Sequence, residues 1–131
     1  MMMNALLALL IMMRLDPSTA YAALAVAACE SGDTITYGSY DSDARSATSD
    51  GGAFQFNDAT WYWMTNQEDF TADQAPLYYQ ILMFDRLWAH GQGSDHWSAS
   101  RACWTQWLSA DGTPLYTSHY GMYLQVLQLY Q

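Results

Sequence analysis

The segment Ala27-Ala28-Cys29-Glu30-Ser31-Gly32 places an acid at the end of an apolar run, and it decides how the rest of the chain is interpreted. Residues 20–29 are almost all Ala, Leu, Val and Tyr. Ala is the best helix former, and a helix that is apolar on all sides is a buried one. Asp16 followed by Pro17 is typical of a helix start, and Gly32 is predicted to end the helix in the left-handed conformation. We therefore expect a buried helix that ends at Glu30.

Glu30 would occupy a poor environment for an ionised carboxylate. Burial disfavours the charged form, and so does the negative end of the helix dipole, so both predict a raised pKa. A carboxyl group with a raised pKa suits a general acid that protonates a glycosidic oxygen near neutral pH. The alternative is an acid that simply faces solvent at a helix end, and for a lone acid this is the commoner case.

The composition limits the classes of function. The chain has 131 residues, enough for one domain with one core, and 51% of them are apolar, which argues against disorder. Its net charge of -9 disfavours nucleic acid and anionic membranes as partners. All four cationic residues are Arg, which excludes a Lys nucleophile or a phosphate-loop Lys. We expect no cofactor and no metal, because His90, His96 and His119 show no ligand spacing.

Two features of the sequence bear on the cellular compartment of the protein: its two cysteines and its apolar N-terminal segment. Cys29 and Cys103 form no metal-binding or CxxC pattern, so they indicate either one long-range disulfide in an oxidising compartment or two buried thiols in a cytosolic protein. Residues 1–15 form an apolar N-terminal segment whose hydrophobic run is too short to span a bilayer. The segment is either signal-like, with a small-x-small pattern at residues 20–22, or a retained packing helix.

Residues 16–108 are predicted to form the main domain, and 109–131 a C-terminal turn and helix. Residues 33–52 indicate a long polar loop, with a short hairpin around 34–40. Helices are predicted from the cap at Asn57 through Met64, over 76–90, over 97–108 and over 120–130. No charged residue follows Asp111, so the last helix is expected to pack on this core or on a neighbouring protein.

An ordered set of short motifs resembles a known superfamily. Glu30-Ser31-Gly32 is followed by a polar loop, by Gly51-Gly52-Ala53-Phe54-Gln55-Phe56, by Thr60-Trp61 and by a Trp-rich segment that contains Cys103. Over about residues 20 to 107 this order resembles the lysozyme-like lytic transglycosylases, and most closely the transglycosylase-like domain of resuscitation-promoting factors and phage virion transglycosylases. The resemblance implies an α+β, mostly α, lysozyme-like fold with a small or absent β-hairpin beside the cleft.

The resemblance also implies a chemistry. Such a domain cleaves the β-1,4 bond between N-acetylmuramic acid and N-acetylglucosamine in peptidoglycan, with Glu30 as the acid and base and Gln55 as a substrate-binding residue. Cys29 and Cys103 would form a disulfide that tethers the catalytic helix to the last helix of the domain. A lysozyme-type hydrolase needs a second carboxylate instead, for which Asp33, Asp41, Asp43 and Asp50 are available.

Aromatic residues are expected to line the glycan groove. Tyr37 and Tyr40 lie in the polar loop and are the better candidates for stacking on sugar rings. Trp61 is a further candidate for substrate binding, and the resemblance implies that Thr60 and Trp61 are either structural or groove-lining. Trp88 and Trp97 are further candidates, although Trp88 lies on the apolar stripe of its helix. Two departures from the family pattern affect this site: the loop before Gln55 is longer than usual, and the Ala-Tyr-Asn type of motif is absent.

The expected partner is therefore the peptidoglycan glycan strand, and the expected location is extracytoplasmic (secreted or in the cell wall) or within a virion. The N-terminal segment and the C-terminal helix are candidate contact surfaces for a protein partner or a larger assembly. Two alternatives stay open. One is a non-catalytic lysozyme-like module with a structural or glycan-binding role, and the other is a cytosolic helical protein with free thiols.

Overall fold

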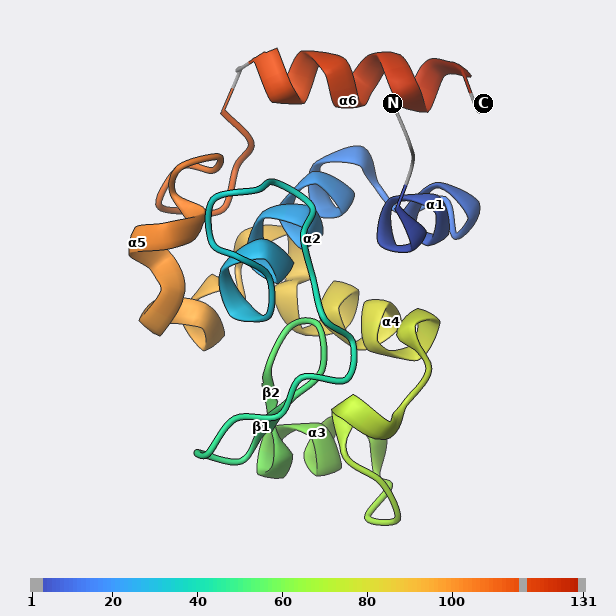
Figure 1. Ribbon diagram of the computed structural model, residues 1–131, viewed down its shortest axis with the longest axis vertical. Coiled ribbons are helices and arrows are strands. Elements are labelled where there is room, and N and C mark those ends of the chain that lie inside the picture. The colour runs from blue at the N-terminus through green and yellow to red at the C-terminus, as the bar shows by residue number, and fades with distance from the viewer. Residues whose placement is uncertain (1–3, 116–117, 130–131) are drawn as a thin grey trace.

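Helix α2, Pro17–Glu30, runs through the middle of the molecule, flanked by α1, α4 and α5 (Figure 1). The computed structural model describes residues 4–115 and 118–129. Ten consecutive residues of α2, 19–28, are buried, as predicted for a helix that is apolar on all sides. The predicted cap is confirmed: the Asp16 carboxylate accepts a hydrogen bond from the backbone N–H of Thr19 at 3.3 Å, and Pro17 follows it. Glu30 therefore lies at the end of a buried helix, as predicted.

The remaining elements make the protein mostly helical. The α-helices are α1 (Ala5–Met12), α3 (Asp58–Thr65), α4 (Leu77–Trp88), α5 (Arg101–Trp104) and α6 (Ser118–Leu129), and the 3-10 helices are η1 (Ala72–Gln74), η2 (Ala89–Gly91) and η3 (Ser94–Ser100). The predictions for α3, with its cap at Asn57, and for α4 are confirmed. The last helix is present as α6, while the predicted end at Tyr130 lies outside the described residues.

A two-stranded antiparallel sheet completes the fold class as α+β. Strand β1, Asp50–Gly51, pairs with β2, Phe56–Asn57. The hairpin predicted around residues 34–40 is wrong. The Asp33 carboxylate accepts hydrogen bonds from the backbone N–H groups of Ile35 and Thr36, at 3.0 and 2.6 Å, and these local bonds form a turn in place of strand pairing.

The helix predicted over residues 97–108 is also wrong in its extent. The chain forms η3 and then only one turn of α-helix, α5. Trp97 departs from helical dihedrals at φ -116° and ψ 30°. Its indole N–H donates to the carbonyl of Phe54 at 2.9 Å, and its own carbonyl accepts from the indole of Trp104 at 3.0 Å. These tertiary hydrogen bonds take precedence over the local helical preference.

Gly32 is needed for a different reason from the one predicted. Its φ is not in the left-handed region, and Ser31 caps α2. A Cβ atom at position 32 would lie 2.6 Å from the backbone oxygen of Ser39, closer than real Cβ atoms approach. The glycine therefore lets the long loop cross directly over the end of α2.

A buried glutamine joins the sheet to the helical core. The side chain of Gln80, on α4, is fully buried and accepts a hydrogen bond from the backbone N–H of Ala53 at 2.8 Å. Its amide donates to the carbonyls of Ser42 and Ala75, at 3.1 and 3.0 Å. Phe54 stacks on Phe84 of the same helix with ring centroids 4.6 Å apart. These contacts fix the hairpin tip against α4.

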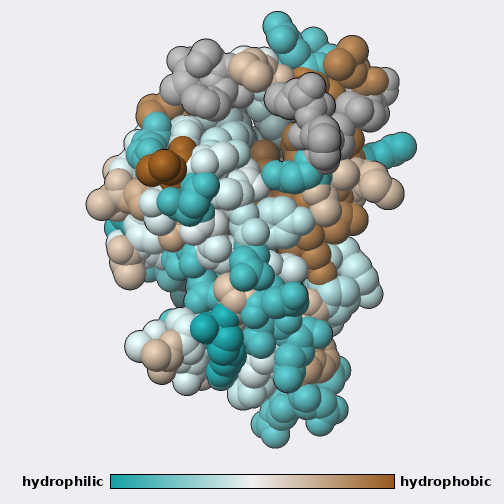
Figure 2. Space-filling view, in the orientation of Figure 1, coloured by the Kyte–Doolittle hydropathy of each residue, from teal (hydrophilic) through white to brown (hydrophobic). Residues whose placement is uncertain are grey.

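The surface is uneven in polarity. Hydrophobic residues gather over α1 and α6, whereas the part around the hairpin and α3 is mainly hydrophilic (Figure 2). Met12 and Leu129 are exposed by 74% and 81%. Across residues 4–115 and 118–129, none of the helices combines the length and the apolar character needed to cross a bilayer.

Candidate active site

Glu30 is half-buried at the point where α2, the hairpin and η3 meet. Its Oε1 accepts a hydrogen bond from the hydroxyl of Ser100, at the end of η3, over 2.9 Å. The pKa of Glu30 is raised to about 7: burial is the largest cause, the Ser100 hydrogen bond opposes it, and the negative charge of Asp50 adds to it. A carboxyl group with this pKa is substantially protonated at neutral pH and can act as a general acid.

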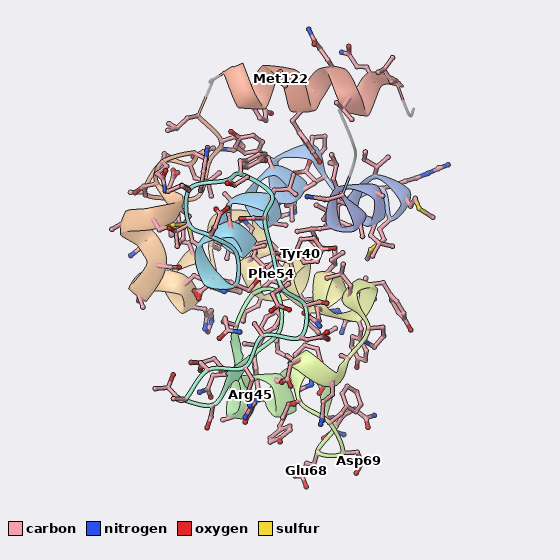
Figure 3. The ribbon with its side chains drawn as sticks, viewed as in Figure 1. Tyr40, Arg45, Phe54, Glu68, Asp69 and Met122 are labelled. Carbon is pink, nitrogen blue, oxygen red and sulfur yellow. A yellow bond between two sulfur atoms is a disulfide. The ribbon has the colours of Figure 1, made fainter. Side chains whose placement is uncertain are left out.

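The hairpin tip is held against Glu30 from two sides. The hydroxyl of Ser31, next to Glu30 in the chain, donates to the carbonyl of Ala53 at 2.7 Å, and it accepts from the backbone N–H of Asp41 at 2.9 Å. The indole of Trp97 donates to the carbonyl of Phe54. Figure 3 shows Phe54 at the centre of the view, with the loop that carries Tyr40 beside it in projection. The motif residues Glu30-Ser31 and 51–56 thus lie together in space.

Asp50 is the carboxylate that the structure singles out among the four named from the sequence. It opens β1, and its charge acts on Glu30. Its Oδ2 accepts hydrogen bonds from the hydroxyls of Thr48 and Ser46, at 2.8 and 3.2 Å, so the carboxylate has a fixed orientation. A second oriented carboxylate is what a lysozyme-type hydrolase requires.

Gln55 lies beside Asp50 in a small pocket of about 80 Å³ between the hairpin and η3. Its backbone is left-handed, with φ 51°, and its amide donates to the carbonyls of Gly52 and Ala44 at 3.0 and 3.2 Å. Thr60 and His96 also line this pocket.

Most of the aromatic residues expected in the groove are core residues instead. Trp61 is fully buried and packs against Phe56, so the prediction that it lines the groove is wrong. Tyr37 is half-buried against the core: its hydroxyl donates to the backbone carbonyl of Tyr21 at 3.0 Å, its ring lies 4.9 Å from that of Tyr21, and its place in the groove stays a prediction. Neighbouring apolar surface offers more contact area to these rings than a solvated groove does.

Of the remaining groove candidates, two are buried in the core and one is half-buried. Trp88 and Trp97 are buried, with 1% and 3% exposure. Tyr40 is half-buried against the core and stays a candidate for sugar stacking.

The disulfide is confirmed. Cys29, the residue before Glu30, is bonded to Cys103 of α5, with Cα atoms 5.8 Å apart. The alternative of two free thiols is therefore wrong. The bond ties the end of α2 to the segment that follows Ser100, so it holds both partners of the Glu30–Ser100 hydrogen bond.

Comparisons with known proteins add no further constraint, since no family model, curated protein or solved structure matches the chain. Among the described residues, no group of three or more His, Cys, Asp or Glu side chains could hold a metal ion. The geometry around Glu30 is therefore the feature of the described residues that bears most directly on function.

Replacing Ser100 with Ala is expected to raise the pKa of Glu30 above its value of about 7. The Ser100 hydroxyl donates to the carboxylate and so stabilises the ionised form, and its loss should add roughly one pKa unit. A ¹³C NMR titration of the Glu30 carboxyl group measures this directly. Ser98→Ala, at an exposed position of η3, is the matched control and should leave the titration unchanged. An unchanged or lowered pKa in Ser100→Ala would contradict the role given to Ser100.

Proposed function

We propose that this chain has a lysozyme-like fold and cleaves the glycan strands of peptidoglycan, as a lytic transglycosylase with Glu30 as its acid and base. The observation that carries the proposal is Glu30 itself, a half-buried carboxyl group with a pKa of about 7 on which the charge of an oriented Asp50 acts. Ser31, which follows Glu30 in the chain, donates a hydrogen bond to Ala53 at the hairpin tip, so the tip lies against the end of α2.

The proposed reaction uses one carboxyl group twice. Protonated Glu30 gives its proton to the oxygen that joins N-acetylmuramic acid to N-acetylglucosamine, and the glycosidic bond breaks. The resulting carboxylate then removes the proton from the C6 hydroxyl of the muramic acid sugar. The C6 oxygen closes onto C1, which leaves a 1,6-anhydro product and returns Glu30 to its protonated state without consuming water.

Asp50 supports hydrolysis as a second candidate. Its carboxylate is held by Thr48 and Ser46, and its charge reaches Glu30. In a hydrolase, Asp50 would act as the nucleophile or would activate water, while Glu30 protonates the leaving oxygen. The product would then carry a reducing end.

Digestion of purified peptidoglycan tests both candidates, with products identified by mass spectrometry. Anhydro-muropeptides that persist in Asp50→Asn but disappear in Glu30→Gln would support the transglycosylase. Reducing-end products that need both residues would support hydrolysis. A folded wild-type protein that forms no product would favour the third candidate, a non-catalytic glycan-binding or structural module.

The proposed location is extracytoplasmic or in a virion. The Cys29–Cys103 disulfide supports an oxidising environment, because cytosolic thiols are kept reduced. The hydrophobic surface over α1 and α6 supports a contact with a larger assembly that would hold the domain near the wall (Figure 2).

A further inference from the structure

Helix α3 carries an exposed tryptophan close to the candidate active site. Trp63 is 76% exposed, and its indole has neither a hydrogen-bond partner nor a ring contact among residues 4–115 and 118–129. The fold does not use this side chain for packing, whereas it buries Trp61 completely on the same helix. The Trp63 ring is therefore open to a ligand that approaches from solvent.

Trp63 belongs to a row of residues that begins at the candidate active site. Asn57, Thr60 and Trp63 follow one another at intervals of three, so they are neighbours along one side of α3. Asn57 and Thr60 line the small pocket beside Gln55, and the Asn57 amide donates to the Asp50 carboxylate at 3.4 Å. Side chains of a helix lean toward its N-terminus, so the Trp63 indole covers the turn that carries Thr60. The indole thus extends the surface of the site along α3.

The neighbours of Trp63 suit a sugar ring. Ala59, one turn nearer the pocket, is exposed and too small to cover the indole, and Asn66 and Gln67, directly after α3, present exposed amides. The C–H face of a pyranose packs on an indole, while its hydroxyl and acetamido groups hydrogen-bond to amides. A protein partner would instead favour a contiguous apolar patch, which these polar neighbours do not form.

The charges near α3 favour an uncharged ligand. Asp58, the single acid of the helix, is paired with Arg45 at 2.5 Å, so neither group is available to a ligand ion. Two exposed acids, Glu68 and Asp69, lie at the tip of the loop that follows α3 (Figure 3). They disfavour anions, including the lactyl-peptide group that distinguishes N-acetylmuramic acid from N-acetylglucosamine.

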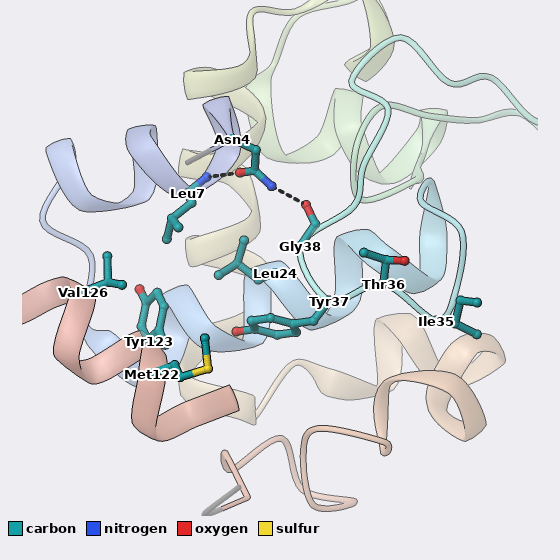
Figure 4. A pocket seen from close by; sticks show the side chains of 10 residues that line it. All are labelled: Asn4, Leu7, Leu24, Ile35, Thr36, Tyr37, Gly38, Met122, Tyr123 and Val126. Carbon is teal, nitrogen blue, oxygen red and sulfur yellow. Dashed lines mark hydrogen bonds between the residues drawn. The ribbon is translucent and has the colours of Figure 1, made fainter. Parts of the chain in front are cut away.

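We propose that Trp63 forms a stacking subsite for an N-acetylglucosamine ring of the glycan strand, one turn of α3 beyond the pocket at Asp50 and Gln55. The subsite deepens the proposed function and rests on it, because it assigns the strand a path from Glu30 along α3. A larger, mainly apolar cavity of about 410 Å³ lies between α1, α2 and α6 (Figure 4). Its described lining residues include neither Glu30 nor any residue of α3, so it lies off this path.

Isothermal titration with chitohexaose, the β-1,4-linked hexamer of N-acetylglucosamine, tests the subsite. The full chain carries Glu30→Gln in these titrations, so that the oligomer is not cleaved. Adding Trp63→Ala should weaken binding about tenfold, whereas Trp63→Phe, which keeps an aromatic face, should stay within about threefold. Met12→Ala, on α1 with a similar exposure of 74%, is the matched control and should bind as tightly as the Glu30→Gln chain. Because Trp63 is exposed, its replacement should leave the melting temperature almost unchanged.

Cleavage of soluble peptidoglycan strands separates the subsite from the proposed function. With Glu30 intact, Trp63→Ala should raise KM about tenfold and leave kcat nearly unchanged, as expected for lost ground-state binding. If the wild type cleaves the strands and Trp63→Ala binds and cleaves equally well, the subsite is overturned while the proposed function stands. If chitohexaose binding depends on Trp63 but the wild type cleaves nothing, the subsite stands while the proposed cleavage fails. A Glu30→Gln chain that shows no saturable binding of chitohexaose overturns the subsite, whatever the cleavage assay shows.

Discussion

Glu30→Gln is expected to lower the rate of peptidoglycan cleavage by about 10²–10⁴-fold and at the same time to stabilise the folded protein. The activity falls because Gln has the shape of Glu but cannot give a proton to the glycosidic oxygen. The stability rises because Gln removes a carboxylate from a site that disfavours its charge. Opposite signs for the two effects are typical of a residue held at a functional site against the preference of the fold.

The gain in stability depends on pH in a defined way. The pKa of Glu30 is about 7 in the folded protein and near its ordinary 4.5 when unfolded. The folded state therefore binds this proton more tightly, so the contribution is fully present below pH 4.5 and is lost as the pH rises through 7. The difference corresponds to about 3 kcal/mol of unfolding free energy above pH 7. Glu30→Gln does not titrate and escapes that loss.

Urea unfolding at about pH 4.5 and about pH 8 measures the effect. The variant and wild type should be similar at the lower pH, whereas the variant should be more stable by about 3 kcal/mol at the higher pH. Glu68→Gln, at an exposed position, is the matched control and should show no such difference. A variant that is less stable than wild type at pH 8 would mean that ionised Glu30 stabilises the folded protein, contrary to the buried environment described for it.

The sequence was informative where the determining interactions are local. Asp16 caps α2 through an N–H three residues away, and Asn57 caps α3 through one two residues away, so both helix starts could be predicted. The failure at residues 34–40 has a local cause as well, because Asp33 bonds the backbone that a strand would have used.

The candidate site could be predicted only in part because its contacts are long-range. Ser100 lies 70 residues from Glu30 in the chain, and nothing in its surroundings marks it as a partner. Asp50 could not be separated from three other loop acids until the hairpin was placed. Gln80 was missed because the pattern that predicts α4 is apolar, while the hairpin needs one buried polar side chain on that same face.

The two tryptophans of α3 show the same limit of prediction from sequence. Trp61 and Trp63 lie two residues apart on α3, yet Trp61 is fully buried and Trp63 is 76% exposed. A helix of eight residues is too short for its periodicity to reveal which tryptophan faces the core. The sequence pattern alone does not say whether Trp61 contacts a substrate or the core.

Replacing both Cys29 and Cys103 with Ala is expected to lower the free energy of unfolding by about 4 kcal/mol. The two residues are 74 positions apart, and in the chain-entropy model closing a loop of that length restricts the unfolded chain by roughly this amount. Urea unfolding of the double variant measures the loss, and the reduced wild type is the control that should unfold at the same urea concentration.

The disulfide is also expected to act locally, on the geometry around Glu30, and not only on the stability of the whole chain. Cys29 precedes Glu30 directly, and Cys103 follows Ser100 by three residues, so the bond keeps the 2.9 Å contact between the Glu30 carboxylate and the Ser100 hydroxyl. In the double variant this contact should loosen, and the Glu30 titration should broaden or shift even where the protein is still folded. A loss of stability with an unchanged titration would show that the core alone positions Glu30 and that the disulfide acts only on the unfolded chain.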